Sequence, residues 1–123
     1  MATLDNRVFD NGLTVLDTEA NKILITSQEA TTFTEANATY ALGDSTSLSI
    51  GAPQDRSGGG REVVVAAITD GSVTATGTAT HYAIVDTANS RLLATSTLTA
   101  SQAVTSGNTF TLSSVAIGIP DPA

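Results

Sequence analysis

The chain has 123 residues, a formal net charge of −7 and no cysteine. Without cysteine, a disulfide scaffold, a thiolate nucleophile and the common structural zinc sites are excluded. Because five Lys and Arg stand against twelve Asp and Glu, we expect no binding to nucleic acid or to anionic membrane surfaces. The length suits one domain over residues 1–123, with a thin core, since only three Phe and two Tyr supply aromatic area.

The first part of the chain predicts strands. Residues 11–27, NGLTVLDTEANKILITS, alternate apolar and other side chains on both sides of DTEAN, as a hairpin does. Residues 28–46 are rich in threonine, which disfavours a helix. A short helix capped by Ser27 is the alternative, but we expect irregular or extended structure with a strand near residues 40–42. Residues 47–50, SLSI, predict another short strand.

Residues 51–60, GAPQDRSGGG, predict a mobile surface loop. A phosphate-binding loop needs a lysine after the glycines and a helix behind them, whereas no lysine and a strand pattern follow here. The sequence REVVVAAI at residues 61–68 is apolar on both faces and predicts a central strand. TDGS at residues 69–72 predicts a hairpin turn, because Asp-Gly favours tight turns.

The second half of the chain continues the strand pattern. Residues 72–86 alternate in polarity but are long for one strand, so we expect a bulge or bend at Gly77. Further turns are expected at residues 87–90 and 105–108, and further strands at residues 91–98 and 109–119. Together the patterns predict an all-β fold, an antiparallel β-sandwich or small barrel of about eight to ten short strands, without a helix of useful length.

Reactive side chains are few. The GDS sequence at residues 43–45 is similar to the nucleophile block of GDSL-type hydrolases, but that family also needs Asp-x-x-His, and a threonine stands three places before the only histidine, His81. A lone histidine in a strand is typical of packing and does not indicate a catalytic triad. No calcium-loop motif occurs, although convergence of the loop carboxylates Asp44, Asp55 and Asp70 is an alternative. We therefore expect no catalytic site, no metal and no cofactor, and we expect that the protein is not an enzyme.

Three segments carry a resemblance over most of the chain. LDNRVFDNGLTVLDTEANKILITS, TATGTATHYAIVD and SQAVTSGNTFTL, in this order, resemble small proteins encoded in the virion-structure gene clusters of tailed bacteriophages and prophages. The resemblance implies a virion structural protein, with a capsid decoration (cement) protein as the preferred role. It implies binding to the outer surface of the major capsid lattice, with the major capsid protein and further copies of this chain as partners, and a trimer as the favoured oligomer.

The resemblance also implies interface residues, for which the candidates are Arg7, Phe9, Arg56 and Arg61. Residues 1–11 are a candidate N-terminal arm that adds a strand to an exposed sheet edge of the partner; the alternative is that Phe9 packs in the domain's own core. The two arginines that flank the three glycines are expected to pair with carboxylates of a partner protein. MATLDNRVFDNG lacks the basic and apolar regions of a signal peptide, so we expect synthesis in the bacterial host cytoplasm and a final location on the capsid exterior.

Other functions stay open at this point. Within the virion, a small tail or head–tail connector component is the next candidate. A glycan-binding adhesive β-sandwich of a spike or fibre is another, but it needs exposed aromatic rings, and this chain has few. A small hydrolase is the third, and the missing base and nucleophile pattern counts against it.

Overall fold

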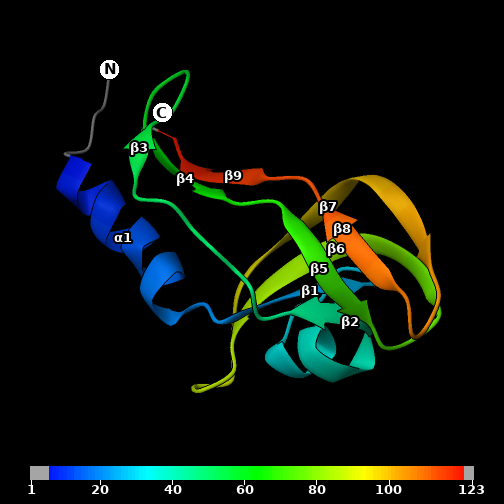
Figure 1. The fold of residues 1–123 in the computed structure, drawn as a ribbon. Coiled ribbons are helices and arrows are strands. Elements are labelled where there is room, and N and C mark those ends of the chain that lie inside the picture. The colour runs from blue at the N-terminus through cyan, green and yellow to red at the C-terminus, as the bar shows by residue number, and fades with distance from the viewer. Residues whose placement is uncertain (1–5, 121–123) are drawn as a thin grey trace. The chain divides into compact units, whose positions relative to one another are not determined.

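A computed structural model describes the backbone of residues 6–120 and the side chains from Asp10 onward. Strands make up 51% of the chain and form two antiparallel sheets, so the predicted all-β class is confirmed (Figure 1). The helices are α1 (Asn6–Glu19) and the short π-helix η1 (Glu35–Thr39), and the strands are β1 (Lys22–Thr26), β2 (Ala41–Ser45), β3 (Gln54–Asp55), β4 (Arg61–Val65), β5 (Ile68–Val73), β6 (Gly77–Asp86), β7 (Arg91–Val104), β8 (Thr109–Leu112) and β9 (Val115–Ile119).

The chain divides into two compact units. The sheet unit contains residues 20–48 and 68–112, which carry the six-stranded sheet and η1. The helix unit is assembled from three separate parts of the chain, residues 6–19, 49–67 and 113–120, which carry α1 and the three-stranded sheet β3-β4-β9. The expectation of a single domain over residues 1–123 stays a prediction.

Strand β1 lies inside the six-stranded sheet, whose order is β7-β6-β1-β2-β5-β8. Four of its five residues are buried, and the exception is Lys22 at its start. The run KILIT suits this place because Ile and Thr are branched at Cβ and pack well on a pleated surface. In the register of the sheet, Leu24 lies opposite Asp44 on β2 and opposite Ala83 on β6.

The two edge strands of this sheet, β7 and β8, come together at one point because the sheet is curled. The side-chain Nε2 of Gln102 on β7 donates a hydrogen bond of 3.0 Å to the backbone oxygen of Thr111 on β8. Otherwise β7 pairs with β6 alone. Its ladder shifts register between Ile84 and Val85, and again at a larger bulge, where Ala79 pairs with Gln102 but His81 pairs with Thr97. The β7 residues between these two pairs therefore lie outside the ladder.

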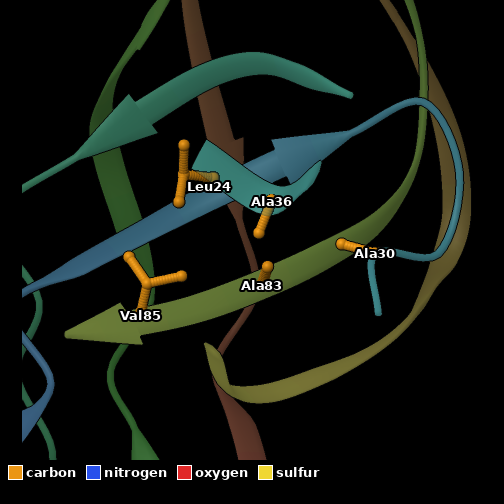
Figure 2. Close-up of a cluster of buried hydrophobic side chains, with 5 residues drawn as sticks. All are labelled: Leu24, Ala30, Ala36, Ala83 and Val85. Atoms are coloured by element: carbon orange, nitrogen blue, oxygen red, sulfur yellow. The ribbon is translucent and has the colours of Figure 1, made fainter. Parts of the chain in front are cut away.

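Residues 27–40 cover one face of β1 and β6 with small side chains. Each of the five side chains at the centre of this contact is 1% exposed or less. Alanine on both sides allows the covering segment to lie close to the strands at the packing density of a protein interior. The buried residues of this alanine contact are Leu24, Ala30, Ala36, Ala83 and Val85 (Figure 2).

The helix α1 corrects the prediction of a hairpin over residues 11–27 and of a fold without a useful helix. Leu13 and Leu16 are both buried while Val15 is 38% exposed, so burial follows a spacing of three rather than the alternation of a strand. The helix contacts β4, where Val63 and Val65 are buried at alternate positions. The buried face of such a helix needs three or four apolar residues over two turns. In a single sequence, this pattern is hard to distinguish from the alternation of a short strand.

The Asp70-Gly71 pair does not form the predicted turn but lies inside β5. A Cβ atom on Gly71 would lie 2.4 Å from the ring of Phe110 on the neighbouring strand β8, so the glycine accommodates that ring. The strand predicted over residues 61–68 ends at Val65, and the chain enters β5 at Ile68. Close packing of a buried aromatic ring thus explains a glycine that the sequence pattern assigns to a turn.

The later predictions are closer to the structure. The long segment over residues 72–86 is interrupted at residues 74–76, next to the expected bend at Gly77. The turns at residues 87–90 and 105–108 are confirmed as connections of β6 to β7 and of β7 to β8. The last segment, over residues 109–119, forms the two strands β8 and β9.

The alanine contact predicts that extra volume at its centre is destabilising. Ala83 is fully buried, so Ala83→Leu should lower the free energy of unfolding by about 1–3 kcal/mol, as overpacking of a filled core does. Ala100, an exposed residue of β7, is the matched control, and Ala100→Leu should change the free energy of unfolding by less than about 0.5 kcal/mol. Urea denaturation followed by circular dichroism measures both values, and equal losses in the two variants would contradict the packing account.

Candidate functional site

Arg61 at the start of β4 forms a closed polar network within the helix unit. Its Nε and Nη2 donate hydrogen bonds to the two carboxylate oxygens of Asp10 in α1, at 2.9 and 3.3 Å. Nη1 donates to Oδ1 of Asp55 at 2.7 Å, and Nη2 also donates to the backbone oxygen of Pro53 at 3.2 Å. The hydrogen bonds to Asp10, and then those to Asp55, raise the pKa of Arg61. The guanidinium therefore joins the helix, the loop and the sheet of its own unit.

Arg56 precedes the glycine run and packs along its own loop. Its Nη1 donates a hydrogen bond of 3.0 Å to the backbone oxygen of Gly59. The side chain lies over Gly118 of β9, where a Cβ atom would be 2.8 Å from the arginine Cδ. Gly60 adopts a φ of 88°, a conformation that favours glycine, and its oxygen accepts a hydrogen bond from the backbone N–H of Arg56. These contacts form a tight surface loop, and a strand follows it as the sequence predicts.

The candidate N-terminal arm over residues 1–11 falls partly outside the described residues. Residues 6–11 belong to α1, and the carboxylate of Asp10 binds Arg61. Residues 1–5 and the side chains of Arg7 and Phe9 lie outside the described part. The role of Arg7, Phe9, Arg56 and Arg61 as interface residues stays a prediction.

His81 and the GDS serine take part in different hydrogen-bond networks. The hydroxyl of Thr80 donates to the backbone oxygen of Ser27 at 3.0 Å and lies 2.8 Å from Nδ1 of His81. The hydroxyl of Ser45 instead donates to Oδ1 of Asp70 at 3.2 Å. The serine is thus next to a carboxylate, and the histidine binds a hydroxyl.

The loop carboxylates weighed for calcium do not converge. Within residues 6–120, no group of three or more His, Asp or Glu side chains has the spacing of a metal site. Asp55 binds Arg61, Asp70 binds Ser45, and Asp44 lies near Lys22. Each of these carboxylates therefore has a different neighbour.

A glutamate stabilises the end of the segment that covers the sheet. Oε1 of Glu35 accepts hydrogen bonds of 2.8 Å from the backbone N–H and from the hydroxyl of Thr31, and Oε2 accepts one of 3.3 Å from the hydroxyl of Tyr40. The hydrogen bonds from Thr31 lower the pKa of Glu35 below its ordinary value of 4.5. In turn, the negative charge of Glu35 raises the pKa of Tyr40. This carboxylate fixes the turn of chain that precedes β2.

Lys22, Asn37 and Asp44 form a polar cluster beside the alanine contact, and sequence reasoning did not identify it. Nζ of Lys22 donates a hydrogen bond of 3.2 Å to Oδ1 of Asn37 in η1 and lies 3.7 Å from Oδ2 of Asp44 on β2. Lys22 is the only lysine of the chain and stands two residues before buried Leu24, on the same face of β1. These two facts could have drawn attention to Lys22 in the sequence. Its partners could not be predicted, because they approach Lys22 only once η1 lies over the strands.

The edge strand β7 begins at Arg91 and is uncharged over the rest of its length. From Leu92 to Val104 the strand carries no Asp, Glu, Lys or Arg, in a chain that is 14% charged. Ser96, Thr97 and Thr99 are exposed hydroxyl residues on this strand. The strand therefore presents hydroxyl groups and one unpaired backbone edge.

No protein-family model, no curated protein and no solved structure matches this chain. Of the helices in the described ranges, none has the length and apolar character needed to cross a membrane.

The Arg61 network predicts that lysine is a poor substitute. Arg61→Lys retains the charge but loses the paired hydrogen bonds to Asp10, so the denaturation midpoint should fall. Arg56→Lys, which removes an arginine bound mainly to its own loop, is the matched control and should lower the midpoint less. Thermal unfolding followed by circular dichroism compares the two, and a larger fall for the Arg56 variant would contradict the network.

The lowered pKa of Glu35 predicts acid sensitivity of the covering segment. A carboxyl whose pKa is lower in the folded state stabilises the protein above its unfolded pKa, and this contribution disappears as the pH falls through the folded pKa. Glu35→Gln should therefore lower stability at neutral pH and flatten the loss of stability between neutral and acidic pH. Urea titrations across this pH range test the prediction, with Glu29→Gln, an exposed glutamate of the same segment, as control. If both variants retain the wild-type pH profile, the Glu35 contacts are not formed in solution.

Proposed function

We propose that this chain is a structural protein of a bacteriophage particle, specifically a capsid decoration (cement) protein that binds the outer surface of the major capsid lattice. The observation that carries the proposal is the edge strand β7, which carries no charge after Arg91. An edge strand offers unpaired N–H and C=O groups to a strand of another protein. A partner strand from the major capsid protein would extend the sheet next to β7.

The composition of β7 supports a covered edge. Proteins protect free edges with lysine, proline, inward charges or short strands. From Leu92 to Val104 the strand has no charge and no proline, and β7 as a whole is 14 residues long. The bulge after Thr97 is one protective feature, and a second register shift lies between the pairs Ile84–Ala94 and Val85–Leu92, so the regular part of the β7 ladder runs from Ala94 to Thr97.

The charge of the chain supports a place outside the packaged DNA. A net charge of −7 repels nucleic acid and keeps free copies of the chain apart. The neutral edge of β7 adds no electrostatic repulsion when a partner protein binds there. A homo-oligomer on the lattice, with a trimer favoured, belongs to the same proposal. A small tail or head–tail connector component would use the same contact chemistry at another place in the virion.

The glycan-binding alternative receives little support from the aromatic side chains. Sugar rings stack on exposed aromatic faces, and no aromatic residue is exposed in the part of the chain whose side chains are described. Tyr82 and Phe110 are buried, and Phe33 and Tyr40 pack against the alanine contact. These rings therefore contribute to the core of the sheet unit.

Co-sedimentation with undecorated shells tests the proposed function. Shells assembled from the major capsid protein encoded in the same gene cluster should carry this protein to the pellet at a fixed, saturable ratio. The double variant Thr97→Glu/Thr99→Glu places two charges on β7 and should reduce the bound fraction at least about tenfold, because two carboxylates would be desolvated in the contact. Thr14→Glu on the exposed side of α1 is the control that should bind like wild type.

Two outcomes would contradict the proposal. In the first, wild-type protein stays in the supernatant at every shell concentration. In the second, the protein is retained on immobilised glycans but not on shells, which would favour the adhesive function.

A further inference from the structure

The polar cluster at the start of β1 brings together the three groups needed to join two side chains covalently. They are a primary amine on Lys22, a carboxamide on Asn37 and a carboxylate on Asp44. The amine nitrogen is 3.2 Å from the amide oxygen of Asn37 and 3.7 Å from the nearer carboxylate oxygen. Each side chain comes from a different element, β1, η1 and β2, so a bond between the first two would fasten the covering segment to the sheet.

We propose that Lys22 and Asn37 form an intramolecular isopeptide bond with release of ammonia, and that Asp44 transfers the protons. Asp44 accepts a proton from the Lys22 ammonium, and the lone pair of Nζ attacks Cγ of Asn37 while the carbonyl electron pair moves to Oδ1. When this pair returns, the bond from Cγ to Nδ2 breaks, and Asp44 gives its proton to the leaving nitrogen. The second proton of Nζ then passes to the released ammonia, which leaves as ammonium. One ammonium ion balances the ammonium group and the amide consumed, and no oxidant or other reactant is needed.

The fold positions the amine and the amide before reaction. Lys22 lies on the same face of β1 as Leu24, and Val85 is its paired residue on β6. Asn37 follows Ala36, which is fully buried in the alanine contact, so η1 is held against these strands (Figure 2). Two groups that rigid elements hold within van der Waals distance react as if each were present at a very high concentration, because they do not have to meet by diffusion.

The carboxylate is placed by sheet register. Asp44 lies directly opposite Leu24 in the antiparallel pair of β1 and β2, so its side chain shares the face of Lys22 at a diagonal position. The Lys22 side chain is 22% exposed and that of Asp44 is 35% exposed, so both side chains reach solvent. Released ammonia can therefore leave to solvent without movement of the sheet.

The alternative is that the cluster is only an ion pair and a hydrogen bond. An ion pair of this exposure contributes little to stability, and it leaves the mass of the protein and the reactivity of Lys22 unchanged. The covalent bond changes both, so the two cases differ in measurements that do not depend on activity.

Mass spectrometry of the purified full chain tests the proposal. The linked protein is lighter than its sequence by the mass of one ammonia molecule. Trypsin cleaves an unlinked chain after Lys22 and yields residues 8–22 and 23–56, whereas the linked chain yields one fragment of residues 8–56 that lacks one ammonia. The fragment ions should show that the side chains of Lys22 and Asn37 are linked. Because the bond is intramolecular, the linked fraction should not depend on protein concentration.

Variants separate the roles of the three groups. Lys22→Arg and Asn37→Ala should give the full sequence mass, with circular dichroism confirming that each variant is folded. Asp44→Asn should form the bond about 100-fold more slowly, which is typical of a lost proton-transfer group. Glu29→Gln, an exposed acid in the same covering segment, is the control and should form the bond at the wild-type rate.

Three results would overturn the proposal. One is folded wild-type protein that retains its full sequence mass after prolonged incubation. Another is loss of ammonia with normal cleavage at Lys22, which would indicate a succinimide at Asn37 instead. The third is a folded Asp44→Asn variant that links as fast as wild type, which would remove Asp44 from the reaction.

Discussion

The contact of small side chains between residues 27–40 and the face of β1 and β6 is the constraint on which the sheet unit depends. The chain has few aromatic residues, so it cannot fill a deep core, and it gains stability from the close approach of alanines to a pleated surface. Ala36 and Ala83 are fully buried in this contact. The Glu35 carboxylate fixes the end of the covering segment, and the same placement brings Asn37 to Lys22.

Polar side chains connect separate parts of the chain in both units. In the helix unit, the Arg61 guanidinium binds Asp10 and Asp55 from two other segments. In the sheet unit, Lys22 connects β1 to η1 and β2. No buried side-chain polar atom of the described residues lacks a hydrogen-bond partner. A chain with a small apolar core can therefore still be ordered. Its free edge at β7 is suited to contact with another protein, as the proposed virion role requires.

The sequence predicts the all-β class, the approximate number of strands and the turns at residues 87–90 and 105–108, because alternation and turn residues are local signals. Prediction from the sequence fails where contacts with residues distant in the chain determine the local structure. Leu13 and Val15 alternate like a strand, but packing on β4 selects a helix. Gly71 follows an aspartate as in a turn, but the ring of Phe110 requires it. No spacing rule identifies the polar cluster, because Lys22, Asn37 and Asp44 are separated in the chain and come together only in the folded structure. For the four predicted interface residues, the structure gives the surroundings of Arg56 and Arg61 alone.

Hydrogen exchange measured by mass spectrometry tests the alanine contact most directly. If this contact is the most stable part of the sheet unit, the amides of β1 and the second half of β6 should exchange slowest, and those of residues 27–40 should open together with them. The amides of β7 that point away from β6 should exchange early. Rapid exchange along β1, or opening of residues 27–40 long before β1 and β6, would show that the covering segment does not hold the sheet and would contradict the account.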